Sequence, residues 1–207
     1  MQPLSDPSPR AAAKAALRRT LRAGRDRRSP AVRAADDAAR TEVLLGRLPD
    51  RPGCLAAYVS AGSEPGTGRL LDRLVAAGWR VLLPVLTDGE RWLPDPAWAP
   101  YAGPADLRIG RAGIREPSGP AGAPRTLGDA ELVVCPGLAG DLAGHRLGRG
   151  GGWYDRALAA ASADALVVVL LNDAEVLPAV PYEAWDRSVH ALVTPSGWRD
   201  CRAPASG

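Results

Sequence analysis

Short apolar runs alternate with amphipathic stretches along most of this 207-residue chain. The apolar runs predict strands at 54–60, 80–86, 131–136, 165–171 and 188–194. Apolar residues at helical spacing predict helices at 11–25, 30–48, 67–77 and 153–162. This alternation predicts an α/β fold: a single three-layer domain with a mostly parallel, Rossmann-like sheet flanked by helices, and an N-terminal helical segment.

Proline, glycine and serine positions indicate where the predicted elements and the domain begin and end. Ser29 can cap the second helix, and Pro30 suits its first turn. Residues 87–128, rich in Gly, Pro and Trp, are expected to form loops with short strands. The single domain is predicted at 10–200, between a disordered tail at 1–9 and a flexible tail at 201–207.

Composition narrows the functional classes. Net charge is +3 and apolar residues make up 46%, which is ordinary for a soluble globular domain. The three cysteines are widely spaced, which predicts neither a disulfide scaffold nor a metal framework and favours a reducing cytosol. No signal peptide or membrane-length apolar run is seen, so we expect a cytoplasmic protein without a membrane partner. The arginines are dispersed and no nucleic-acid motif is present, so a basic nucleic-acid-binding module is a less favoured alternative.

One segment carries a chemical signal. After the strand at 131–136 comes a loop in which four of residues 148–152 are glycine, followed by a predicted helix. Glycines let backbone N–H groups converge on an anion, and a helix start adds partial positive charge. Arg146 and Arg149 bracket the loop and could clamp phosphate oxygens, and Asp155 could hold a bridging metal. The run is neither a Walker A loop nor a dinucleotide fingerprint; a flexible glycine linker is the structural alternative.

Residues 136–156 closely resemble the signature of the 5-formyltetrahydrofolate cyclo-ligase family. The resemblance extends to three further motifs in family order: Lys-x-x-Leu-Arg at 14–18, the segment 58–67, and Gly-Ile-x-Glu-Pro at 113–117. Together they cover roughly residues 11–195. The resemblance implies conversion of 5-formyltetrahydrofolate to 5,10-methenyltetrahydrofolate, with ATP and Mg²⁺ as cofactors and release of ADP and phosphate. It further implies a phosphorylated formyl (iminium phosphate) intermediate, a small-molecule folate as partner, and a monomer.

The same resemblance assigns the site residues. Catalysis is expected from Lys14, Arg149 and Asp155, with Asp155 as the metal ligand. The nucleotide is expected at Lys14, Arg18, Arg146, Leu147, Gly148, Arg149, Gly150, Gly151, Gly152, Trp153 and Tyr154. The folate is expected at Val59, Glu64, Arg149, Gly150, Gly151, Gly152 and Trp153. Lys14 has independent support, because it is the single lysine among 26 basic residues and a compact ammonium is not equivalent to a guanidinium at a phosphate.

Two positions depart from the family pattern. His190 stands where many relatives have an aspartate that helps to hold Mg²⁺, and histidine is a poor ligand for that hard cation. We interpret His190 as an ordinary strand histidine. Ala112 stands where relatives often carry an aromatic residue near the folate, and Trp92 is a weak candidate for that surface. These departures leave two alternatives: a non-catalytic paralogue that binds ATP or folate, and a different ATP-dependent enzyme on the same scaffold.

Overall fold

The computed structural model describes residues 9–202 except 90 and 120–123. Most of the tails predicted at 1–9 and 201–207 lies outside the described residues. A seven-stranded sheet forms the centre of the structure, in the order β11-β10-β9-β6-β1-β2-β3. The strands are β1 Cys54–Ala56, β2 Arg80–Asp88, β3 Arg91–Tyr101, β6 Leu132–Pro136, β9 Leu166–Leu170, β10 Ala191–Thr194 and β11 Gly197–Asp200. The five inner strands are parallel, whereas β3 and β11 are antiparallel edges.

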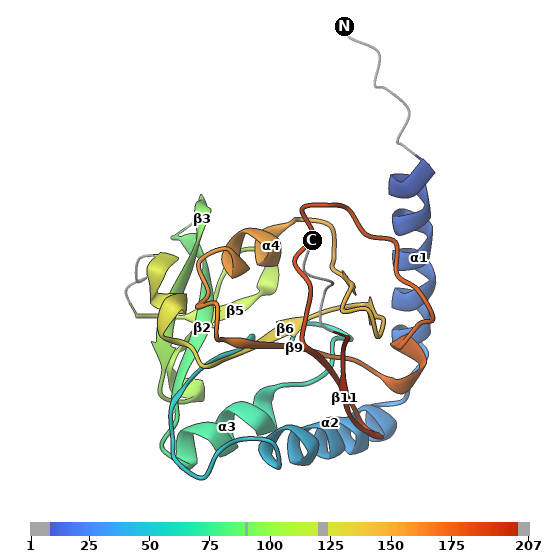
Figure 1. Cartoon of the computed structure of the whole chain (residues 1–207). Helices are drawn as coiled ribbons and strands as arrows, with labels where there is room; N and C mark the ends of the chain where they lie inside the picture. Colours follow the sequence, from blue (N-terminus) through green and yellow to red (C-terminus); the bar gives the residue numbers. More distant parts are fainter. Residues whose placement is uncertain (1–8, 90, 120–123, 203–207) are drawn as a thin grey trace, which may run out of the picture.

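Helices cover both faces of the sheet (Figure 1). Helices α2 Pro30–Leu45 and α3 Gly68–Ala76 close one hydrophobic core, which contains Leu44 and Leu71. On the opposite face, α4 Trp153–Leu158 and the 3-10 turn η3 Pro124–Asp129 pack over a second core around Trp98. The predicted three-layer α/β domain is therefore confirmed.

Helix α1, Pro9–Asp26, stands apart from these layers at the side of the domain (Figure 1). It contributes to neither main core. Leu17 and Leu21 pack instead on a small separate cluster that includes Leu138 and Leu147. No helix in the described part of the chain is both long and apolar enough to cross a membrane.

The edges of the sheet differ most from the predicted pattern. The region predicted as loops contains the 11-residue strand β3, which includes Pro94, Pro96 and Pro100. Prolines lack a donor and argue against an inner strand, but an edge strand that pairs on one side tolerates them. The remaining elements are small: strands β4 Leu107–Ile109, β5 Arg115–Pro117, β7 Ala139–Gly140 and β8 Arg146–Leu147, and 3-10 turns η1 Pro104–Asp106, η2 Arg111–Gly113 and η4 Asp173–Glu175.

Candidate active site

A cavity of about 1320 Å³ opens beyond the carboxyl ends of β1 and β6 and extends past α4 to the segment before β10. Ligands of open parallel sheets bind at this edge because the loops that follow the strands converge there. Every site residue predicted from the sequence lines this one cavity: Lys14, Arg18, Val59, Glu64, Arg146, Leu147, Gly148, Arg149, Gly150, Gly151, Gly152, Trp153, Tyr154 and Asp155.

The glycine-rich loop needs its glycines for backbone reasons. Gly150 and Gly152 have φ angles of 111° and 61°, in the region that other residues rarely adopt. Gly152 is also the residue from which α4 starts. The helix is only six residues long, shorter than the predicted 153–162, so its dipole adds little. An anion on this loop would be bound mainly by backbone N–H groups and the surrounding cations.

Helix α1 is attached to the glycine-rich loop by arginines. The Arg18 Nε donates to the Gly148 carbonyl at 2.9 Å, and the Arg22 Nη2 donates to the Arg149 carbonyl at 3.3 Å. Arg25 is buried, donates to the Gly137 carbonyl at 2.6 Å and pairs with both oxygens of Glu175. These contacts fix the helix that carries Lys14 relative to the loop.

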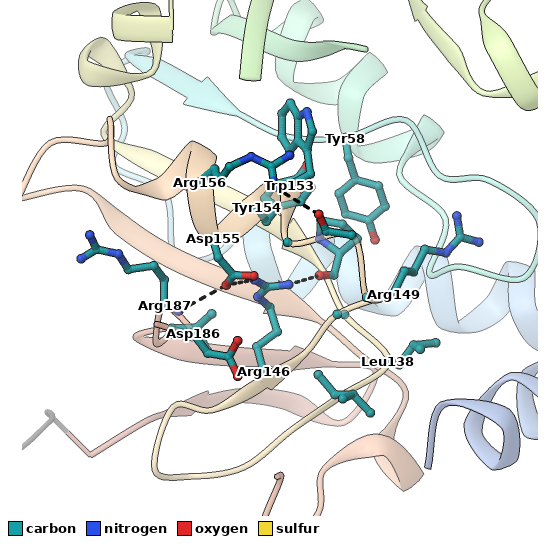
Figure 2. Close-up of a pocket in the computed structure, with 18 of the residues that line it drawn as sticks. Tyr58, Leu138, Arg146, Arg149, Trp153, Tyr154, Asp155, Arg156, Asp186 and Arg187 are labelled. Atoms are coloured by element: carbon teal, nitrogen blue, oxygen red, sulfur yellow. Dashed lines mark hydrogen bonds and ion pairs between the residues drawn. The ribbon is translucent and has the colours of Figure 1, made fainter. Parts of the chain in front are cut away.

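Residues that line the cavity form two ion pairs, of which Figure 2 shows the one between Arg146 and Asp155. The Arg146 Nη2 donates to the Asp155 Oδ1 at 2.9 Å, and the same oxygen accepts the Arg187 N–H at 3.2 Å. Lys14 is 9% exposed, and its Nζ lies 2.6 Å from the Asp186 Oδ2. The cavity therefore holds opposite charges in pairs, which a charged ligand can exchange for its own contacts.

Glu64 lines the cavity beside Arg149 and close enough to Tyr58 for its charge to affect that hydroxyl. The Glu64 Oε2 accepts the Ala61 N–H at 2.8 Å, and its Oε1 lies 3.3 Å from the Arg149 Nε. Figure 2 shows Tyr58 and Arg149 on one side of the Arg146–Asp155 pair, with Asp186 and Arg187 on the other. The carboxylate of Glu64 is thus held in place at a polar end of the cavity.

The buried acidic hydroxyl and thiol groups near the cavity stay protonated at neutral pH. Burial raises the pKa of the Tyr58 and Tyr154 hydroxyls well above their ordinary value, and the charge of Glu64 adds to both shifts. Burial also raises the pKa of the Cys135 thiol to about 12, although Arg146 opposes this shift. A thiol nucleophile needs a lowered pKa, so Cys135 is suited to packing and not to covalent catalysis.

Asp186 and Trp185 line the cavity but were not singled out from the sequence. They lie in an irregular segment without periodicity, where no residue pattern points to a cavity. The available signal was a carboxylate two residues before the strand predicted at 188–194. Trp98 is fully buried in the core, whereas Trp185 is exposed.

The two departures from the family pattern have different outcomes. The His190 Nδ1 accepts the Val167 N–H at 2.8 Å, and the His190 N–H donates to the Val167 carbonyl at 2.7 Å. This agrees with an ordinary strand histidine, although His190 also borders the cavity. Ala112 falls in η2, but its side chain lies outside the described part of the structure.

The donor set suits a polyphosphate better than a protein-bound metal cluster. The loop 148–152 offers backbone N–H groups, and Lys14, Arg18 and Arg149 line the same cavity. Any residue other than glycine at 150 or 152 would have a strained backbone. The buried Arg146 Nε and Tyr154 hydroxyl have no hydrogen-bond partner among the described residues. The same residues contain no group of three or more His, Cys, Asp or Glu side chains placed to hold a metal. Asp155 could supply one carboxylate to a Mg²⁺ whose other ligands are phosphates and water.

The fold and this arrangement are typical of α/β enzymes that bind a phosphorylated ligand on a glycine-rich loop. The chain belongs to the 5-formyltetrahydrofolate cyclo-ligase family, whose sequence model matches residues 10–195. Membership confirms the family recognised in the sequence and the predicted enzyme class, a ligase of folate metabolism.

Individual relatives match this chain over two thirds of its length or more. It is 40% identical over 190 residues to the 5-formyltetrahydrofolate cyclo-ligase of Mycolicibacterium smegmatis, a match that covers 91% of this chain and 95% of that protein. It is 32% identical over 143 residues to the enzyme of the same name from Escherichia coli, covering 69% and 78%. The solved 5,10-methenyltetrahydrofolate synthetase of Aquifex aeolicus superposes with a TM-score of 0.76 at 28% identity, covering 94% and 95%. The synthetase of Mycoplasma pneumoniae, at 15% identity and a TM-score of 0.67, shares the fold.

Proposed function

We propose that this chain converts 5-formyltetrahydrofolate to 5,10-methenyltetrahydrofolate at the expense of ATP, with Mg²⁺ as cofactor. The observation that carries the proposal is the convergence of Lys14, Glu64, the glycine-rich loop and Asp155 on one cavity, although they lie far apart in the sequence. Family membership supports the reaction class.

The reaction needs a better leaving group than the formamide offers. Ring closure requires attack by N10 on the formyl carbon, and the formyl oxygen would otherwise have to leave as hydroxide. The formyl oxygen instead attacks the γ-phosphorus of ATP and ADP leaves, which gives an iminium phosphate. N10 then attacks the activated carbon and loses its proton, and phosphate departs with the former formyl oxygen. The protein's task is positioning and charge neutralisation, as in other phosphoryl transfers.

Each wall of the cavity has a role in this scheme. Lys14, Arg146, Arg149 and the glycine N–H groups offset the charge of the phosphoryl group as it moves. Arg18 holds the loop, and Glu64 accepts hydrogen bonds from the pterin and orients it. Asp155 would hold Mg²⁺, and the ion would supply positive charge that offsets the charge of the phosphates. The formyl oxygen would meet the γ-phosphate near Arg149, between the two ends of the cavity.

Turnover can be followed by the near-ultraviolet absorbance of the methenyl product. We expect product with ATP and Mg²⁺ present, none when ATP is omitted, and little when Mg²⁺ is chelated. Asp155→Ala should lose most activity, whereas Asp164→Ala, an exposed aspartate outside the cavity, should retain it. Wild-type rates in Asp155→Ala would contradict the site assignment. Tight ATP binding without any product would favour the non-catalytic paralogue.

We further propose that the protein is monomeric and cytoplasmic, without nucleic-acid or membrane partners. Salt-sensitive binding to RNA or DNA that survives Arg149→Ala would contradict the absence of a nucleic-acid partner, because such binding would not use the cavity.

A further inference from the structure

One segment crosses the cavity without belonging to the sheet or to a helix. Residues 180–190, which we call the strap, rise beside α1 and pass over to β10 (Figure 1). Near each end of the strap, a backbone N–H donates a hydrogen bond to the rest of the domain. The Val180 N–H donates to the Asp141 Oδ2 at 2.8 Å, and the Val189 N–H donates to the Gly144 carbonyl at 2.8 Å.

The middle of the strap is anchored to the cavity itself. Asp186 pairs with Lys14, and its Oδ2 also accepts the Glu183 N–H at 2.8 Å. The next N–H along, that of Arg187, donates to Asp155. The two residues that follow Trp185 are therefore held against Lys14 and Asp155, and Glu183 before it is bonded to Asp186.

Trp185 is the exposed aromatic of this anchored segment. Its side chain lines the cavity and is 72% exposed. The other aromatic side chains that line the cavity contact other residues of the protein. Tyr58 is buried and donates to the Pro65 carbonyl, and Trp153 and Tyr154 pack on each other and on Trp98. A large apolar ring at a ligand cavity is a stacking surface, and no aromatic ring among the described residues packs on that of Trp185.

We propose that Trp185 is the surface on which the adenine ring of ATP stacks, so that the strap determines nucleotide affinity. This inference rests on the proposed function and adds to it the residue that recognises the base. Aromatic side chains stack on nucleobases through their π-faces, and each such contact contributes roughly 5- to 150-fold in affinity.

Position favours adenine over the pterin as the stacked ring. Asp186, adjacent to Trp185, contacts the Lys14 ammonium that is proposed to bind the phosphates. Glu64, proposed to bind the pterin, pairs with Arg149, which lies with Tyr58 on the other side of the Arg146–Asp155 pair (Figure 2). A nucleotide whose phosphates reach Lys14 would therefore have its base near the strap, and the folate would have its ring at the far end.

The test is calorimetric titration of Mg-ATP into the folded protein without folate. Trp185→Ala should weaken ATP binding by roughly 5- to 150-fold, and Trp185→Phe, which keeps a stacking ring, should restore most of the affinity. Tyr182→Ala is the matched control, because Tyr182 is an exposed aromatic of the same strap that stacks on His145 outside the cavity. It should bind ATP like the wild type. The KM for 5-formyltetrahydrofolate should not change in Trp185→Ala.

Inorganic tripolyphosphate measures how tightly the phosphates bind in the absence of a base. Trp185→Ala should bind it as tightly as the wild type, whereas Lys14→Ala should bind it more weakly. Unchanged ATP affinity in Trp185→Ala, or a raised KM for the folate alone, would overturn the inference and leave the proposed function standing. A wild-type protein that binds neither ATP nor tripolyphosphate would overturn the proposed function and the inference with it.

Discussion

The two N-terminal helices are neighbours in sequence but are held in place by different forces. Helix α2 buries Leu44 completely in the main core and packs against α3 and β10. Helix α1 is attached by the guanidinium groups of Arg18, Arg22 and Arg25, which donate to carbonyls of the segment 137–149. Apolar burial in the main core thus dominates the packing of α2, whereas α1 adds only Leu17 and Leu21 to a small cluster and is attached mainly by guanidinium hydrogen bonds.

The difference separates stability from ligand binding. Burial of apolar area is non-directional and contributes mainly to the free energy of folding. Hydrogen bonds to a ligand loop fix geometry, and catalysis is sensitive to small displacements of such a loop. Substitutions in α2 should therefore change stability, and substitutions along the cavity side of α1 should change nucleotide use.

Leu44→Ala tests the α2 side of the comparison. Its buried side chain leaves a cavity on truncation, so we expect a loss of about 2–5 kcal/mol in the free energy of unfolding. Denaturant unfolding measures this loss, and the KM values for ATP and folate should stay at wild-type levels. Val32→Ala, on an exposed side of the same helix, is the control. Equal losses from both variants would contradict the role given to burial.

Lys14→Ala tests the α1 side. Removing a cation that stabilises the moving phosphoryl group should lower kcat/KM by about 100- to 1000-fold. Steady-state kinetics measures the effect, and Arg19→Ala, an exposed position on the same helix, should behave like the wild type. A stability loss in Lys14→Ala as large as that of Leu44→Ala would remove the contrast between the helices.

Arg18→Ala should have a smaller effect of the same kind. It removes a charged donor from the Gly148 carbonyl and a guanidinium that lies beside Gly150. Charged hydrogen bonds contribute about 1.5–3 kcal/mol, so we expect the KM for ATP to rise about 10-fold or more. An unchanged KM would show that the loop keeps its geometry without α1.

Glu42→Ala should give the smallest effect. Glu42 on α2 pairs with Arg73 of α3 at 3.0 Å, and both side chains are about half exposed. Such pairs contribute about 0.2–1 kcal/mol and are screened by salt. Unfolding at low and high salt should show a small difference from the wild type that disappears as salt rises.

The sequence predicted most of the fold, and the residues it singled out line one cavity, for reasons that particular residues make clear. The apolar run at 165–171 forms the inner strand β9 as predicted, and Ser29 caps α2 as expected, with its Oγ accepting the Val32 N–H. The full length of β3 was not predicted because it contains three prolines. Prolines are tolerated in a strand at the edge of a sheet, and the local sequence does not reveal that β3 lies at an edge. Trp185 could not be placed either, since only the tertiary path of the strap brings it to the cavity.

The phosphorylated formyl intermediate can be tested by the fate of a single oxygen atom. The substrate is 5-formyltetrahydrofolate labelled with ¹⁸O in the formyl group, incubated with ATP, Mg²⁺ and the wild-type protein. Mass spectrometry of the released phosphate should find one ¹⁸O atom in each phosphate, formed in step with the methenyl product. Unlabelled phosphate, or product without ATP, would contradict the account.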